Sequence, residues 1–188
     1  RIVKIRKAYQ ACSEGEDRTY LIMDYTEHTL DLFDHVDTKC ENNECNDYRE
    51  IVKLMCLCIK DVHDAGYYHG DIKMENFVLP AGNVKDLLLL DFGFASADEG
   101  KPMNVCGGTR QYLAPEVFDT RKCTRASDIW SLGSVLLFMV VRLVYRRDVD
   151  LRLYITNNDF LEVVTNCLII DPSKRWTIDQ ILASKWLM

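Results

Sequence analysis

The sequence His69-Gly70-Asp71-Ile72-Lys73-Met74-Glu75-Asn76 decides the fold, together with two shorter segments that follow it in the chain. These segments are Asp91-Phe92-Gly93 and Ala114-Pro115-Glu116. Taken alone, each acid or amide has an ordinary explanation, because Asp and Asn are common turn residues. Unrelated turns would not reproduce all three segments in this order, so together they predict one functional site.

The three segments resemble the signature set of eukaryotic-type serine/threonine protein kinases, where they form the catalytic loop, the metal-binding segment and the end of the activation segment. Phosphoryl transfer needs a carboxylate near the accepting hydroxyl and oxygen ligands for Mg²⁺. The resemblance implies that Asp71 is the catalytic carboxylate, and that Asn76 and Asp91 bind Mg²⁺. Lys73 is similar to the lysine that marks serine/threonine rather than tyrosine kinases, and would lie beside the γ-phosphate of ATP.

A strand and hinge for the adenine of ATP are implied by the segment Leu21-Ile22-Met23-Asp24-Tyr25, which resembles the fifth strand of a kinase. Met23 would take the gatekeeper position, and the backbone of Asp24 and Thr26 would face the adenine. Leu79 would lie under the purine ring, because an apolar face suits a flat heterocycle. Ordinary core packing remains the alternative for Met23 and Leu79.

Downstream residues resemble the structural frame of a kinase lobe. The segment Ser127-Asp128-Ile129-Trp130-Ser131-Leu132-Gly133 resembles the start of its central buried helix, in which Asp128 would accept backbone hydrogen bonds from the catalytic loop. Arg175 matches the arginine that pairs with the glutamate of Ala-Pro-Glu, here Glu116. The resemblance assigns these three residues structural roles.

The catalytic loop departs from the family at Gly70, where most kinases have an arginine that receives a phosphorylated residue of the activation segment. Counting back from Ala-Pro-Glu, Thr109 matches the threonine that touches the catalytic loop, and the usual phosphosite falls near Val105, which cannot carry phosphate. We therefore expect that any activity does not require phosphorylation of this segment. Glu75 matches a position that favours a basic residue upstream of the target serine in some kinases, although a solvated acid is the alternative.

The pattern along the chain predicts an α+β fold, and the resemblance implies that this fold is protein-kinase-like, with one partial kinase domain over residues 1–188. Residues 1–25 read as a strand remnant of the N-lobe with its hinge, and residues 26–188 as a mainly helical C-lobe. A helix is predicted for residues 48–65, and a β-hairpin around Pro80-Ala81-Gly82-Asn83. The apolar stretch 132–145 is too short to span a bilayer and predicts a buried helix.

Two functions remain open because no glycine-rich loop or third-strand lysine precedes Arg1, which is itself not a methionine. The first is a serine/threonine kinase, present as a fragment or a reduced form, that transfers the γ-phosphate of ATP to protein hydroxyls. The second is an inactive pseudokinase or decoy that binds proteins. The interval 141–160 is shorter than the family's usual stretch, so a helix that commonly docks substrates and regulators is expected to be trimmed.

Composition restricts the partners and the compartment. The net charge of −6 and pI near 5.2 argue against nucleic acid and anionic membranes, so the expected partner is a protein substrate with a Ser or Thr side chain, while any regulatory partner is unknown. Eight cysteines without a secretory signal predict free thiols and an intracellular location, in cytoplasm or nucleus. Zinc binding at Cys40 and Cys45 is disfavoured, because structural zinc usually has four ligands. Phe94-Ala95 and Tyr112-Leu113 resemble the cyclic-nucleotide-regulated and calmodulin-regulated kinase groups.

Overall fold

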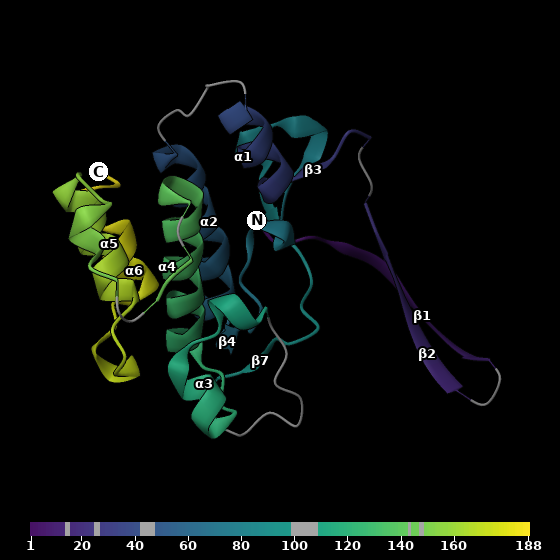
Figure 1. Ribbon diagram of the computed structural model, residues 1–188. Coiled ribbons are helices and arrows are strands. Elements are labelled where there is room, and N and C mark those ends of the chain that lie inside the picture. Colours follow the sequence, from purple (N-terminus) through teal and green to yellow (C-terminus); the bar gives the residue numbers. More distant parts are fainter. Residues whose placement is uncertain (14–15, 25–26, 42–47, 99–108, 143, 147–148) are drawn as a thin grey trace.

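The structure is a computed structural model of the 188-residue chain. It describes residues 1–13, 16–24, 27–41, 48–98, 109–142, 144–146 and 149–188, without the side chains of residues 11–13, 16–18 and 39–41. A helical body carries a long two-stranded arm, and the N-terminus lies within the body (Figure 1). The combination of helices with small antiparallel sheets confirms the predicted α+β class.

The arm is an antiparallel pair formed by β1 (Ile5–Ser13) and β2 (Glu16–Met23), and it lies within the strand remnant predicted for residues 1–25. Its apolar side chains are between 44% and 54% exposed, and they are Ile5, Tyr9, Tyr20, Leu21, Ile22 and Met23. An isolated pair of strands is only marginally stable in water. We therefore expect the arm to be the least stable part of the described chain.

Two small sheets frame the catalytic loop. The first has the order β3 (Leu30–Asp31), β5 (Phe77–Leu79) and β6 (Leu88–Leu89), with antiparallel neighbours. The pairing of β5 with β6 confirms the predicted hairpin, whereas β3 was not predicted. The second sheet pairs β4 (Tyr67–Tyr68) with β7 (Ser96–Ala97). The loop and the segment after Asp91 are therefore joined by backbone pairing.

Helices make up most of the body. They are α1 (Leu32–Glu41), α2 (Arg49–Asp64), α3 (Pro115–Thr120), α4 (Arg125–Val141), α5 (Asn158–Cys167) and α6 (Ile178–Leu182). Single 3₁₀ turns lie at Met74–Asn76, Pro80–Gly82, Val84–Asp86, Arg110–Tyr112, Leu151–Leu153 and Pro172–Lys174. The helix predicted for residues 48–65 is confirmed by α2, while α1 was not predicted.

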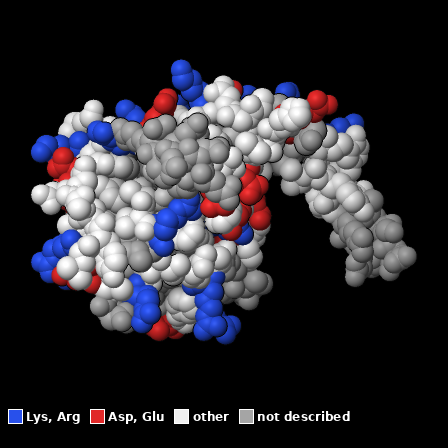
Figure 2. Space-filling view, turned by 45° about the horizontal axis from the view of Figure 1, so that its top comes forward, with Lys and Arg blue, Asp and Glu red and all other residues white. Residues whose placement is uncertain are grey.

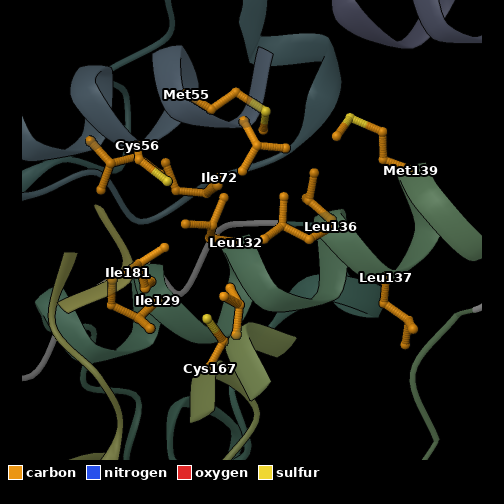
Figure 3. Packing of buried hydrophobic residues seen from close by; sticks show 14 of the residues in the cluster. Met55, Cys56, Ile72, Ile129, Leu132, Leu136, Leu137, Met139, Cys167 and Ile181 are labelled. Atoms are coloured by element: carbon orange, nitrogen blue, oxygen red, sulfur yellow. The ribbon is translucent and has the colours of Figure 1, made fainter. Parts of the chain in front are cut away.

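The core is built around α4, which lies between α2 and α5 (Figure 1). Figure 3 shows Leu132 and Leu136 of α4 facing Met55 and Ile72 across the interior. A Cβ on Gly133 would lie 2.5 Å from the Cβ of Cys167, so only glycine allows α5 to approach this closely. These contacts place the catalytic loop over a tightly packed interior.

The predicted buried helix extends less far than its apolar pattern indicated. The pattern ran over residues 132–145, but α4 ends at Val141 and Arg142 adopts a left-handed conformation, with φ at 59°. A left-handed residue commonly terminates a helix. Within the described residues, no helix is long and apolar enough to cross a membrane.

Candidate active site

The Asp71 carboxylate is the centre of the site and is 5% exposed. Its Oδ2 accepts bonds from Lys73 Nζ at 2.9 Å and from Asn76 Nδ2 at 3.2 Å. Its Oδ1 accepts the backbone N–H of Thr109 at 3.0 Å. The 3₁₀ turn Met74–Asn76 bends the chain back, so Asn76 Nδ2 also reaches the Asp71 carbonyl oxygen at 2.7 Å. Four residues predicted from the sequence thus meet within hydrogen-bond distance.

The charge state of Lys73 follows from this arrangement. The hydrogen bond that Lys73 donates to Asp71 raises the pKa of Lys73 above its ordinary value, while partial burial acts in the opposite direction. The charges of Asp71, Glu75 and Asp91 raise this pKa further. Lys73 is therefore a cation at physiological pH, and its charge lies against the Asp71 carboxylate.

A buried carboxylate holds the backbone of the catalytic loop. Asp128, which is 1% exposed, accepts the N–H of His69 at 2.7 Å and that of Gly70 at 2.9 Å. His63, near the end of α2, contributes its Nε2 to the same carboxylate at 2.9 Å. The two backbone bonds hold the start of the catalytic loop against α4, so Asp128 fixes the position from which Asp71 extends.

The Asp91 segment is joined to the loop from the other side. The N–H of Leu90 donates to the Asn76 carbonyl oxygen at 2.8 Å, and His69 Nε2 lies 2.8 Å from the Leu90 carbonyl oxygen. The Phe92 ring contacts the His69 ring edge on, with centroids 5.0 Å apart. Asp91 has a φ of 56°, a conformation that is rare outside glycine and tends to occur at functional sites. Its Oδ1 accepts the Gly93 N–H at 3.1 Å.

Gly70 is required by the same contact between the two segments. Its φ is +82°, and a Cβ built there would lie 2.7 Å from the Phe94 carbonyl oxygen. Both the conformation and the space therefore favour glycine. The residue that departs from the family pattern is what lets the catalytic loop lie directly against the backbone after Asp91.

An apolar pocket of about 400 Å³ lies between the base of the arm and the sheet that contains β5 and β6. Met23 and Asp24 line it, together with Leu88 and Leu90. Arg6 binds the Asp24 carboxylate with two nitrogens, at 2.7 and 2.8 Å, and this bond lowers the pKa of Asp24. Thr26, the other predicted hinge residue, lies outside the described residues.

The structure corrects the assignment of Leu79. Leu79 is 0% exposed and does not line the pocket, whereas its neighbour Val78 does. Successive side chains of a strand point to opposite faces, so a shift of one residue exchanges core and pocket. Val78 is therefore the residue of β5 that lines this pocket.

The remaining predicted residues lie at the edge of the site or below it. Arg175, whose side chain is 0% exposed, donates from Nη1 and Nη2 to the two oxygens of Glu116, both at 2.6 Å. Thr109 reaches the site through its backbone, and the Glu75 side chain is exposed to solvent. Val105 lies outside the described residues.

One face of the molecule, which Figure 2 shows, carries basic and acidic side chains close together. Among the coloured atoms, the acidic ones gather most densely near its middle. A polyanion would need a continuous positive surface, which this mixed face does not offer.

The protein kinase domain family model matches residues 1–187. The chain belongs to the eukaryotic-type serine/threonine protein kinase family. This kinase chain is 31% identical over 213 aligned positions to the serine/threonine-protein kinase MPS1 of Saccharomyces cerevisiae. The aligned region covers 92% of the chain and 27% of MPS1. The chain is 30% identical over 199 positions to the serine/threonine-protein kinase SIK2 of Gallus gallus, covering 97% of the chain and 24% of the relative.

A third relative of the kinase chain is the calcium/calmodulin-dependent protein kinase cmkB of Emericella nidulans. It is 29% identical over 180 positions, which cover 84% of the chain and 44% of the relative. The kinase chain spans about a quarter of the length of the first two relatives. Members of the family generally use ATP and Mg²⁺.

The oxygen donors of the kinase chain suit Mg²⁺ by type. No cluster of three or more His, Cys, Asp and Glu side chains that could hold a metal occurs in the described ranges. Mg²⁺ in kinases is bound by one or two carboxylates together with substrate phosphates, so such a cluster is not needed. The amide nitrogen of Asn76 is bonded to Asp71, which leaves its amide oxygen as the group for a cation.

His63 was also missed from the sequence, although a signal was present. It lies four residues after Ile59 on the buried face of α2, and six residues before the catalytic loop. A polar side chain on the apolar face of a helix needs a buried partner. That requirement identifies His63 as a residue bonded within the site, but it does not identify Asp128 as the partner.

Proposed function

We propose that this chain carries the catalytic carboxylate and the metal-binding side chains of an ATP-dependent kinase that phosphorylates Ser or Thr hydroxyls of a protein substrate. The single observation that carries the proposal is the Asp71 carboxylate, buried and bonded to Lys73, Asn76 and the Thr109 backbone. Unlike Asp128, whose partners are two backbone N–H groups and a histidine, Asp71 faces a lysine and an amide side chain as well as a backbone N–H.

The acceptor sites of the Asp71 carboxylate support a position for the substrate hydroxyl. Each carboxylate oxygen has two acceptor sites, and Lys73 and Asn76 fill those of Oδ2. Among the described residues, the Thr109 N–H is the one donor to Oδ1, so we assign the second site of this oxygen to the hydroxyl. Asp71 then orients the hydroxyl and accepts its proton as the phosphoryl group is transferred. Lys73 lies close enough to this carboxylate to place positive charge beside the transferred phosphoryl group.

The ATP site that we propose combines the apolar pocket with the oxygen donors. Met23 and Val78 would contact the adenine, and the backbone of Asp24 and Thr26 would bond to its edge. Asn76 and Asp91 would hold Mg²⁺, which neutralises charge on the phosphate oxygens when it is bound. Glu75, exposed beside the loop, would favour a basic residue in the substrate.

Phosphate transfer to a protein substrate tests the proposal, with the wild type, Asp71→Asn and Asp91→Ala purified in parallel. We expect Asp71→Asn to lower the rate by about 10²- to 10⁴-fold, the range for loss of a general base. Asp91→Ala should abolish phosphate transfer. Equal signal from all three proteins would mean a contaminating kinase and would reject catalysis by this chain.

A second function, a protein-binding module without catalysis, is favoured by one observation. The arm exposes apolar side chains from both strands, including Tyr9, Tyr20 and Leu21. Exposed apolar surface of this kind marks interaction sites. Absence of transfer in the wild type, with a folded chain, would favour this function.

We place either activity inside the cell, in the cytoplasm or nucleus. The cysteines whose side chains the structure describes are all buried and form no disulfide, and they are Cys56, Cys58, Cys123 and Cys167. Free thiols are typical of reducing compartments.

A further inference from the structure

The segment that follows Asp91 is attached to the rest of the protein at Asp98. The carboxylate of Asp98 accepts a hydrogen bond from Arg125 Nε at 2.5 Å, and its backbone N–H donates to the Gly66 carbonyl oxygen at 3.0 Å. Just before it, Ser96 and Ala97 pair with Tyr68 and Tyr67. Residues 96–98 are thus held by backbone pairing and hydrogen bonding, and Asp98 is also held by an ion pair.

Arg125 is placed to connect this segment with the catalytic loop. It is the first residue of α4, and three residues later the same helix carries Asp128, which binds the backbone of His69 and Gly70. Residues three apart lie on one face of a helix, so Arg125 and Asp128 are neighbours. Arg125 Nη1 also lies 3.5 Å from the His63 carbonyl oxygen, a weak contact with the end of α2.

We propose that Arg125 is a positioning residue, which through Asp98 fixes the Asp91 segment against the catalytic loop. One turn of α4 then holds both halves of the site, with Asp128 bonded to the loop and Arg125 bonded to the segment. Asp98 supplies a permanent negative charge, so the segment is fixed without phosphate. The positioning role of Arg125 does not depend on the proposed function. Only its expected effect on catalysis rests on that function.

Solvent limits how much the ion pair between Asp98 and Arg125 can stabilise the segment. The Arg125 side chain is 50% exposed and that of Asp98 is 15% exposed. An exposed ion pair contributes little to global stability and is weakened by salt. The pair should therefore control the local opening of residues 96–98 rather than the unfolding of the protein.

Hydrogen–deuterium exchange of residues 96–98 tests this inference without any need for catalysis. We expect Asp98→Asn and Arg125→Gln each to accelerate exchange there by about 1.5- to fivefold, with an unchanged thermal midpoint. Exchange at His69 and Gly70 should stay slow, because Asp128 is intact. In 1 M NaCl the wild type should approach the variants.

Two further variants separate charge pairing from general loosening. The swapped pair, Asp98→Arg with Arg125→Asp, should restore slow exchange. Arg152→Gln is the matched control, because Arg152 forms a similar exposed ion pair with Asp150 away from the site. Unchanged exchange in both single variants, or equal acceleration by Arg152→Gln, would overturn the inference.

Phosphate transfer provides the separate readout for catalysis. If the wild type transfers phosphate, both single variants should lower kcat, and the swapped pair should recover it. If the wild type transfers none while exchange behaves as expected, the proposed function fails and the positioning role stands. Normal kcat with accelerated exchange would contradict positioning of the catalytic site.

Discussion

Gly70 shows at the scale of one residue how closely the two segments of the site are packed. Its Cβ position is blocked by the Phe94 backbone, whereas at Gly66, with a similar φ of +84°, no atom lies within 4 Å. The two glycines therefore separate a conformational requirement from a packing requirement. Only Gly70 is subject to both.

Alanine at these two positions provides the test. Gly66→Ala should lower the free energy of unfolding by about 1–2 kcal/mol, the cost of a left-handed residue with a side chain. Gly70→Ala should cost about 1–3 kcal/mol more, because the methyl group must displace the Phe94 backbone. Urea unfolding measures both. Equal losses in the two variants would mean that the contact with Phe94 has no energetic weight.

Single residues also mark the limit of prediction from sequence. The types and spacing of Asp71, Lys73 and Asn76 were sufficient to predict that they meet, since all three lie in one short loop. The choice between Val78 and Leu79 was not, because a three-residue strand contains too little alternation to fix which side faces the pocket.

At the scale of elements, Arg175 joins α3 to the segment that follows α5. Besides its two bonds to Glu116, it donates to the carbonyl oxygens of Ala126 and Ile169, and it lies over the Trp130 ring at 4.9 Å. Removing one partner of such a buried pair leaves the other charge without compensation.

Glu116→Ala should therefore lower the free energy of unfolding by about 3–5 kcal/mol. Urea unfolding measures this loss, and Glu162→Ala, at an exposed position of α5, is the control. A Glu116→Ala chain as stable as the wild type would show that the pair is not needed for the fold.

Elements with a strong local pattern were predictable, and those fixed by distant contacts were not. The apolar period of α2 and the turn at residues 80–83 predicted a helix and a hairpin that the structure contains. The two-residue strand β3 exists only because it pairs with β5. The pair between Asp98 and Arg125 depends on tertiary contacts in the same way.

At the scale of the whole molecule, buried thiols link stability to alkaline pH. Burial raises the pKa of Cys58 and Cys167 from 9.0 to about 12. Below pH 9 the thiols are protonated in both folded and unfolded chains. Between pH 9 and 12 only the unfolded chain ionises, so stability falls as pH rises.

Each thiol should remove up to about 1.4 kcal/mol of unfolding free energy per pH unit in this range. Urea unfolding at pH 8 and pH 10.5 measures the fall, and Cys167→Ala should reduce its slope. Comparison of slopes removes the cost of the cavity, which is the same at both pH values. An unchanged slope would mean that Cys167 does not control the alkaline transition.

The central claim for the molecule is that its described residues form the metal-binding and phosphate-binding floor of a kinase site. Calorimetric titration with ATP, with and without Mg²⁺, tests this claim most directly. We predict that Mg²⁺ strengthens ATP binding to the wild type by about tenfold or more. The Asp91→Ala substitution should remove this gain without changing the affinity for adenosine. ATP binding that is indifferent to Mg²⁺, or equally strengthened by Mg²⁺ in Asp91→Ala, would contradict the account.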